Sequence, residues 1–220
     1  MSAAADVFTS IDDVLAHVDA LASSDQRRII GLTGAPGAGK STVALQLVAH
    51  RPARSVLVPM DGFHLANAEL ARLGRGSRKG AQDTFDSAGY VALLRRLRSA
   101  PADEIIYAPE FHREIEEPIA GAIPVLPEHR LIVTEGNYLL LETGHWRGIR
   151  PLVDEIWYIE IDPELRLERL IARHIRYGRA EPAARAWVAQ TDEPNAELIA
   201  ATRARADRIL RLPAATPPPL

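Results

Sequence analysis

Eight consecutive residues carry the clearest chemical signal in this 220-residue chain. From Gly34 to Ser41 the sequence is Gly-Ala-Pro-Gly-Ala-Gly-Lys-Ser, which fits the pattern G-x-x-x-x-G-K-[ST]. Glycines let successive backbone N–H groups turn inward around an anion, and a following helix adds its positive N-terminal end. The segment therefore predicts a cradle for the phosphates of a nucleoside triphosphate. The residues predicted to bind the nucleotide here are Gly34, Ala35, Pro36, Gly37, Ala38, Gly39, Lys40, Ser41 and Thr42.

Two side chains of this segment suit the outer end of a triphosphate. The Lys40 ammonium would reach the outer phosphates, and the Ser41 hydroxyl is suited to ligate Mg²⁺. An apolar run at residues 28–33 precedes the motif and a helical pattern at 41–50 follows it, as the motif requires. A glycine-rich turn without a nucleotide is the alternative. The sequence thus predicts ATP and Mg²⁺ as cofactors.

Two carboxylates end separate apolar runs. Asp61 follows the run 55–59 and would lie at the carboxyl end of a strand, where sheets of this kind bind ligands. The alternative is that Asp61 caps a helix. Glu135 follows the run 131–134, where a buried charge requires a cation or strong donors. Mg²⁺ held together with Ser41 would satisfy it, and an ion pair with an arginine is the alternative.

Hydrophobic patterning predicts the elements that must position these residues. Short apolar runs alternate with helical patterns, which indicates an α/β fold with a doubly wound parallel sheet and helices on both faces. The predicted strands are residues 28–33, 55–59, 104–107, 131–134, 155–161 and 208–212. The predicted helices are residues 11–22, 41–50, 88–98, 164–177 and 182–205.

We expect three parts along the chain. Residues 1–24 contain an amphipathic helix that packs on the core, because its apolar residues fall on one helical stripe. Residues 25–212 form one P-loop domain. Residues 213–220 are rich in proline and form a flexible tail. Within the domain, residues 73–86 are polar, rich in glycine and long for a connection, which favours a functional loop.

Composition excludes several classes of protein. The chain has no cysteine, so it has no disulfide framework, thiolate zinc site or cysteine nucleophile. A net charge of −3 gives no general attraction to nucleic acid or anionic lipid. The first residues lack the pattern of a signal peptide, and no apolar run approaches the ~18 residues that span a bilayer. We therefore expect a cytoplasmic protein with a small-molecule partner, with no nucleic-acid or membrane partner. A homodimer is one option for the assembly.

Four motifs, in this order, resemble the group of P-loop kinases that contains uridine kinase, phosphoribulokinase and type I pantothenate kinase. They are Gly34 to Ser41, Met60-Asp61-Gly62-Phe63-His64, Arg78-Lys79-Gly80 through Asp83-Thr84-Phe85-Asp86, and Glu135-Gly136-Asn137-Tyr138-Leu139-Leu140. More narrowly, the chain is similar to bacterial fructose transport system kinases and to the nucleoside/nucleotide kinase family. The resemblance covers about residues 27–212. It implies transfer of the ATP γ-phosphoryl group to a hydroxyl of a sugar, nucleoside or pantothenate-like metabolite.

The resemblance also implies roles for single residues. Asp61 matches the carboxylate that accepts a proton from the acceptor hydroxyl, and Glu135 matches the acidic residue that ends the third core strand. Lys79 and Asp83 match a stretch that borders the acceptor site. Lys79 is also unusual in composition, because it and Lys40 are the only lysines among 26 basic residues.

Three arginines resemble the arginine-bearing lid of uridine kinases, at about residues 169–190. Arg169, Arg173 and Arg176 lie at i, i+4 and i+7, close to one helical face. We predict that Arg169 binds the nucleotide and that Arg173 and Arg176, with Lys40, neutralise charge during phosphoryl transfer. A solvated helix face is the alternative.

Other candidates for the acceptor site follow the ends of predicted strands. Arg113 is the first of these, and it would bind an acceptor hydroxyl or carboxylate, or pair with Glu116 or Glu117. His64 and His112 would hydrogen-bond a polyol or serve a structural role. The remaining candidates are Tyr107, Asn137 and Tyr138.

A regulatory or switch NTPase that acts through a protein partner is the alternative function. The chain contains no N-K-x-D guanine motif. The sequence therefore favours a small-molecule kinase over a switch.

Overall fold

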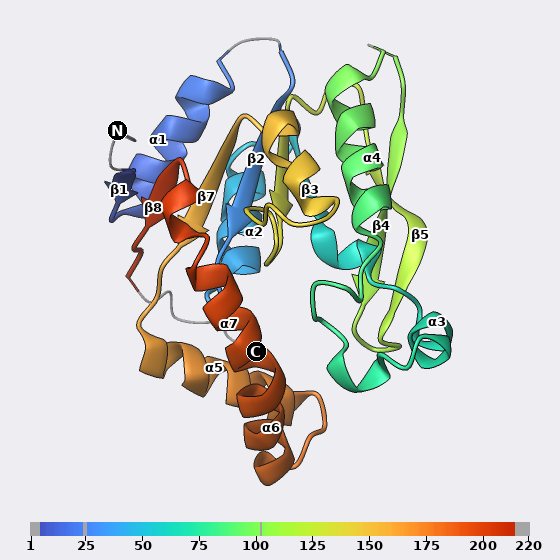
Figure 1. Ribbon diagram of the computed structural model, residues 1–220. Coiled ribbons are helices and arrows are strands. Elements are labelled where there is room, and N and C mark those ends of the chain that lie inside the picture. Colours follow the sequence, from blue (N-terminus) through green and yellow to red (C-terminus); the bar gives the residue numbers. More distant parts are fainter. Residues whose placement is uncertain (1–4, 24–25, 102, 214–220) are drawn as a thin grey trace.

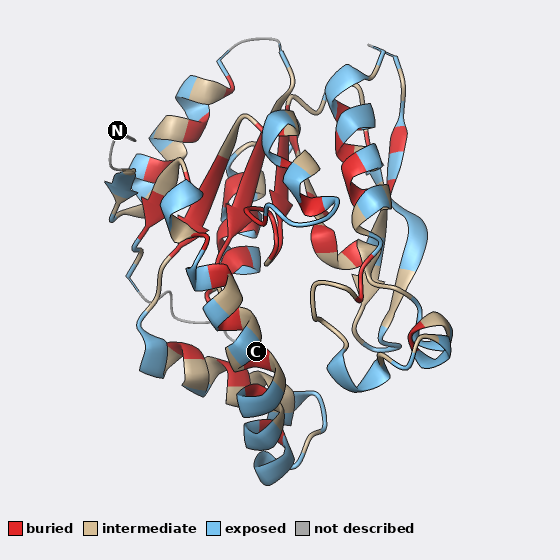
Figure 2. Ribbon diagram, viewed as in Figure 1, coloured by how far each residue is buried: buried red, intermediate tan, exposed pale blue. Residues whose placement is uncertain are grey.

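Apolar strands lie side by side at the centre of the protein, and the central ones are buried (Figure 1, Figure 2). The computed structural model describes residues 5–23, 26–101 and 103–213. Six strands form one parallel sheet in the order β1-β8-β7-β2-β6-β3. They are β1 (Asp6–Phe8), β2 (Arg28–Thr33), β3 (Ser55–Pro59), β6 (Leu131–Glu135), β7 (Glu155–Ile159) and β8 (Arg208–Leu210).

Helices cover both faces of this sheet. Successive residues of β2 point to opposite faces, so Ile29 belongs to the apolar cluster of Leu94, whereas Ile30 belongs to the cluster of Leu47 and Val18. The helices are α1 (Ile11–Leu21), α2 (Lys40–His50), α3 (Asn67–Arg72), α4 (Ser87–Ser99), α5 (Pro163–Arg176), α6 (Glu181–Trp187) and α7 (Glu193–Ala200). The predicted doubly wound parallel sheet with helices on both faces is confirmed.

One predicted strand belongs to a different sheet. Residues 104–107 were expected in the parallel sheet, but β4 (Ile106–His112) pairs antiparallel with β5 (Glu117–Val125) in a separate two-stranded ribbon. The register shifts between Ala108 and Glu110, at Pro109. Proline cannot donate a backbone hydrogen bond and is confined to sheet edges and bulges, so Pro109 is the physical reason against a central strand.

The predicted helix at residues 182–205 is divided. It consists of α6, a π-helical turn at Val188–Asp192, α7 and a 3-10 turn at Arg203–Arg205. Pro194 lies in the first turn of α7 and has no N–H to continue the α-helical ladder, which accounts for the break. The helices α5 and α6 contact each other, and α6 lies away from the sheet (Figure 1). The predicted flexible tail is residues 213–220, of which 214–220 lie outside the described residues.

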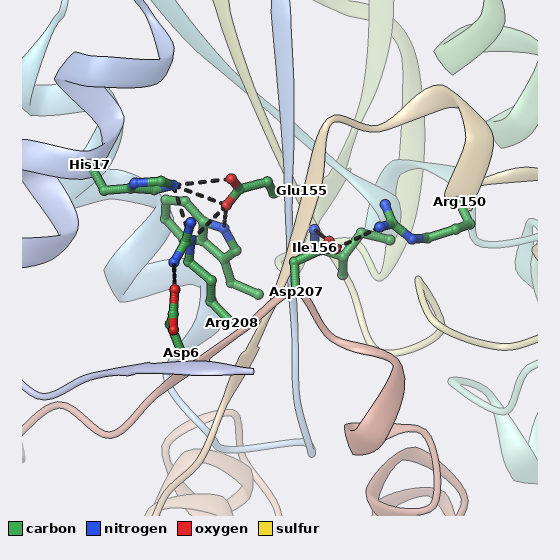
Figure 3. Close-up of polar contacts among 8 residues, drawn as sticks. Asp6, His17, Arg150, Glu155, Ile156, Asp207 and Arg208 are labelled. Carbon is green, nitrogen blue, oxygen red and sulfur yellow. Dashed lines mark hydrogen bonds and ion pairs between the residues drawn. The ribbon is translucent and has the colours of Figure 1, made fainter. Parts of the chain in front are cut away.

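A polar network fixes the N-terminal strand and helix to the sheet (Figure 3). The Arg208 guanidinium donates to Asp6 at 2.7 Å and to Glu155 at 3.0 Å, and a His17 ring nitrogen lies 3.1 Å from Glu155. The Trp157 indole also donates to Glu155, at 2.6 Å. Burial raises the pKa of Glu155, but these hydrogen bonds outweigh burial and lower it. The network therefore holds β1 beside β8. The sequence did not predict β1, because a strand of three residues is too short to give a periodic pattern.

None of the helices in the described part of the chain is long and apolar enough to cross a membrane.

Candidate active site

Three neighbouring strands end level with one another at the carboxyl edge of the sheet. Glu135 on β6 lies opposite both Leu32 on β2 and Pro59 on β3. The glycine-rich segment Gly34 to Ser41 begins just after β2, and Asp61 lies just after β3. Because the strands are parallel, this register brings the segment and both carboxylates to one edge of the sheet.

The segment between β2 and α2 depends on backbone conformations that favour glycine. Gly37 has a φ of +83° and Gly39 a φ of +92°. A Cβ atom on Gly37 would lie 2.7 Å from Leu170 Cγ, so the segment packs directly against α5. Helix α2 begins at Lys40, directly after Gly39, with its N-terminus at the turn. The chain thus has the strand, turn and helix that an anion-binding loop requires.

The Lys40 side chain folds back over the loop and is buried. Its ammonium donates hydrogen bonds to the carbonyl oxygens of Gly34 at 2.9 Å and Ala35 at 3.1 Å. Burial lowers the pKa of Lys40 to about 8, and the carboxylates of Glu135 and Asp61 oppose the shift. An anion in the loop would favour the charged ammonium in the same way.

Glu135 and Ser41 form the candidate metal site. The Ser41 hydroxyl donates to a Glu135 carboxylate oxygen at 3.0 Å. Burial and the nearby Asp61 charge raise the pKa of Glu135, so a cation is the partner that this carboxylate needs. A hydroxyl and a carboxylate are hard oxygen ligands, and Mg²⁺ takes one or two such groups together with phosphate oxygens. These residues fit Mg²⁺ bound with a nucleotide.

Asp61 lies in the 3-10 turn Met60–Phe63 and does not cap a helix. The next helix, α3, begins at Asn67 and has no side-chain cap. The Asp61 carboxylate instead accepts a hydrogen bond from Arg113 at 3.3 Å. Both side chains are about one-third exposed, at 32% and 39%. Arg113 therefore pairs with Asp61, and not with the neighbouring Glu116 or Glu117 that the sequence offered as partners.

Close packing brings the β4–β5 ribbon against this turn. A Cβ atom on Gly62 would lie 2.3 Å from the carbonyl oxygen of Pro109, so only glycine allows the approach. The ring of His64 lies 4.0 Å from Phe85 and 4.6 Å from Phe111, centroid to centroid. His64 Nδ1 donates to the Asp61 carbonyl oxygen at 2.8 Å, and burial lowers the pKa of His64. The histidine is thus a neutral, mainly structural group.

Lys79 belongs to a group of contacts that joins three separate segments. Its ammonium donates to Asn67 Oδ1 at 2.6 Å and to the carbonyl oxygen of Glu116 at the ribbon turn. The Asn67 backbone N–H donates to the Glu117 carboxylate at 3.0 Å. The ammonium also lies over the Phe111 ring, 5.1 Å from its centroid. We call Asn67, Lys79, Glu116 and Glu117 the ribbon tie, because they fasten the ribbon turn to α3 and the 73–86 loop.

The three predicted lid arginines occupy different environments. Arg169 and Arg173 line a cavity beside the glycine-rich segment, whereas Arg176 is exposed at the end of α5. Burial and, to a smaller extent, the Arg113 charge lower the pKa of Arg173. The sequence analysis missed Arg166, which is buried and pairs with Glu193 at 2.5 Å. Arg166 anchors the base of α5.

A cavity of about 1120 Å³ extends from the glycine-rich segment. Residues 37–43 form its inner end, and Arg169, Arg173 and residues 211–213 line it further out. Residues 9–12, which are the β1–α1 connection and the first two residues of α1, also line it. The sequence analysis assigned the N-terminal helix only to packing and had no signal for this role. The volume is sufficient for a nucleotide.

Two predicted acceptor residues lie on β4 (Ile106–His112). Tyr107 and His112 are at opposite ends of β4, about 16 Å apart at ~3.3 Å per residue. Tyr107 is exposed. His112 lies 3.5 Å from Glu110, on the strand face opposite Phe111. The ribbon therefore brings Phe111 against His64 and Arg113 against Asp61, and the acceptor roles of Tyr107 and His112 stay predictions.

Three other predicted acceptor residues have structural partners. Asp83 pairs with Arg78 within its own loop. The carbonyl oxygen of Asn137 accepts from Thr33 at 3.0 Å. Tyr138 is fully buried and its hydroxyl donates to the Gly80 carbonyl. The Tyr138 hydroxyl is consequently engaged in holding the 73–86 loop.

The chain is similar in sequence to proteins named as kinases. It is 35% identical over 152 residues to the ATP-dependent kinase-like protein notR' of Aspergillus versicolor, which covers 66% of this chain and 88% of that protein. It is 34% identical over 179 residues to a candidate uridine kinase of Schizosaccharomyces pombe, which covers 77% of this chain and 76% of that protein. No protein-family model matches the chain.

The fold is also found in solved structures. A candidate fructose transport system kinase from Silicibacter sp. TM1040 superposes with a TM-score of 0.82 and 34% sequence identity. That similarity covers 92% of this chain and 99% of the other.

Proposed function

Because the chain belongs to the P-loop kinase group, we propose that it transfers the γ-phosphoryl group of ATP to a hydroxyl of a small-molecule acceptor. The observation that carries this proposal is the strand register that brings the glycine-rich segment, Asp61 and Glu135 to one sheet edge. Residues 25–212 would act as one kinase domain, with a lid at about 169–190. The cytoplasmic location, the homodimer and the absence of a nucleic-acid partner stay predictions.

The nucleotide would lie in the cavity that extends from the glycine-rich segment. Backbone N–H groups at the start of α2 and the Lys40 ammonium would hold the phosphates, with Arg169 and Arg173 on the outer wall. Ser41 and Glu135 would hold Mg²⁺, which neutralises charge on the phosphates when bound. These residues align the donor and stabilise charge, which is most of what phosphoryl transfer requires of a protein.

Asp61 would act on the acceptor. Its carboxylate would accept the proton of the acceptor hydroxyl as that oxygen bonds to the γ-phosphorus, while the bond from this phosphorus to the β,γ-bridging oxygen breaks and ADP leaves. Arg113 donates a hydrogen bond to one carboxylate oxygen of Asp61. The other oxygen is the acceptor for the hydroxyl proton.

The test is ADP release with and without an acceptor. We expect ADP release to depend on a hydroxylated metabolite from a panel of sugars, nucleosides, pantothenate and glycerate. Asp61→Ala should lower this turnover by ~10²-fold or more, because general-base help is lost, while nucleotide binding is retained. Near-normal turnover of Asp61→Ala would contradict the assignment. Hydrolysis that no acceptor stimulates would favour a switch NTPase instead.

A further inference from the structure

The aromatic rings around the Asp61 turn are packed against one another. Phe85 and Tyr138 are buried, and their centroids lie 5.7 Å apart. His64 contacts Phe85 and Phe111. Phe111 in turn lies under the Lys79 and Arg113 cations, at 5.1 and 5.8 Å from its centroid. Among the described residues on this side of Asp61, the rings are engaged in packing, which leaves charge and hydrogen bonding as the means of recognition.

Two other cations, Lys79 and Arg173, are the alternatives to Arg113 as groups that could bind the acceptor. The Lys79 ammonium is held by Asn67 and the Glu116 carbonyl oxygen in the ribbon tie. Arg173 lines the cavity beside the glycine-rich segment, where it would face the nucleotide. Each of these two cations thus has another contact or lines another cavity, and Arg113 is the cation bonded to Asp61.

Arg113 is the cation that faces the acceptor side of Asp61. Its hydrogen bond to Asp61 is long, at 3.3 Å, and uses one terminal nitrogen. A guanidinium has five N–H donors in a planar fork that matches a carboxylate or a phosphate. The side chain is 39% exposed, so the remaining donors face solvent next to the proposed base. Arg113 thus offers a fork for an anionic group within a few ångströms of Asp61.

On these grounds, and resting on the proposed kinase function, we propose that the acceptor is a small non-aromatic acid that carries a hydroxyl. Its hydroxyl contacts Asp61, and its carboxylate or phosphate group binds Arg113. Arg113 is then the residue that selects an anionic acceptor over its neutral analogue.

Matched acceptors test this directly, with ADP release as the readout. Each pair shares its hydroxyl groups and differs in a negative group: glycerate and glycerol, pantothenate and pantothenol, fructose 6-phosphate and fructose. Uridine is included in the assay as an acceptor that carries an aromatic ring. We expect the anionic member of the preferred pair to have at least tenfold higher kcat/KM than its neutral partner. The carboxylate and phosphate pairs distinguish the two kinds of anion.

Variants of Arg113 assign the selectivity to a residue. Arg113→Gln should raise KM for the anionic acceptor by about 10- to 100-fold, as loss of a charged hydrogen-bonding partner predicts, and should leave the KM for ATP unchanged. Arg113→Lys keeps the charge but loses the fork, so its effect should be smaller. Arg95→Gln makes the same change in charge at an exposed position of α4 and should have no effect.

Each outcome bears on one proposal or on both. Preference for uridine or for neutral acceptors, or an anionic preference that survives in Arg113→Gln, overturns the anionic class and leaves the kinase function standing. If none of these acceptors raises ADP release above the acceptor-free rate, the kinase function and the inference both fail.

Discussion

The proposed nucleotide half and the proposed acceptor half of the site are built in different ways. In the nucleotide half, one continuous segment from β2 to α2 supplies the loop backbone, Lys40 and Ser41. In the acceptor half, the Asp61 turn, the 73–86 loop and the β4–β5 ribbon come from separate parts of the chain. Side-chain contacts such as the ribbon tie hold these segments together. The phosphate loop is therefore local in sequence, whereas the acceptor half depends on contacts between distant residues.

This difference predicts different responses to mutation. The loop holds phosphate mainly through its backbone, and few side chains take part. Loss of any side chain that contacts phosphate should therefore have a large effect on catalysis. A surface assembled from several side chains should lose acceptor affinity in smaller steps, because each contact fixes only part of the ribbon.

The largest effect should come from Lys40. Lys40→Met removes the ammonium that would hold the outer phosphates, and we expect kcat to fall by about 10³-fold, at the upper end for one charge-stabilising donor. Acceptor-dependent ADP release measures this. The thermal melting temperature serves as a control for the lost hydrogen bonds to Gly34 and Ala35. If kcat of a folded Lys40→Met variant falls by less than tenfold, the nucleotide half does not depend on single side chains more strongly than the acceptor half does.

A smaller effect is expected when pH changes the charge of the same residue. Burial lowers the pKa of Lys40 to about 8, so the free protein loses this ammonium proton above that pH. Nucleotide binding requires the charged form, so affinity should fall as pH rises past 8, by about tenfold between pH 7 and pH 9. Titration calorimetry with ADP and no acceptor reads only the nucleotide half. Equal affinity at pH 7 and 9 would contradict this assignment.

The same difference explains what the sequence could predict. The glycine-rich motif, the apolar runs before Asp61 and Glu135, and the parallel sheet all leave local patterns, and β2 and β3 have the predicted bounds. Pro109 was a local signal against a central strand at 104–107. By contrast, the cavity wall at residues 9–12 depends on the pairing of β1 with β8, two hundred residues apart in sequence. No local pattern encodes that contact.

The acceptor half shows the same limit at the level of side chains. The sequence placed Arg113 near the site and offered an acceptor group, Glu116 or Glu117 as its partner, but not Asp61, because a ribbon turn can direct a long side chain several ways. Tyr138 lies three residues after Glu135, yet its ring enters the core and its hydroxyl donates to the Gly80 carbonyl oxygen. Such choices depend on packing between distant segments, which spacing alone does not determine.

The smallest effect should come from the ribbon tie. Lys79→Met removes one of two donors to the Glu116 carbonyl oxygen, the other being Asn67 Nδ2 at 3.1 Å, so the ribbon turn and Arg113 should be less well positioned. We expect acceptor KM to rise by roughly fivefold, as for loss of a partly exposed hydrogen bond of ~1 kcal/mol. Acceptor KM and ATP KM are measured in the same ADP-release assay, and ATP KM should stay unchanged.

Conservative and paired variants separate the tie from direct contact between Lys79 and the acceptor. Lys79→Arg keeps a donor at this position and should restore most of the acceptor affinity. If Lys79 acts through the tie, Asn67→Ala should raise acceptor KM as well, and the double variant should be less affected than the sum of both changes. Full additivity would indicate that Lys79 contacts the acceptor itself. Unchanged acceptor KM in Lys79→Met would instead mean that the ribbon turn is held without this lysine, and the acceptor half would then depend on less side-chain contact than the structure indicates.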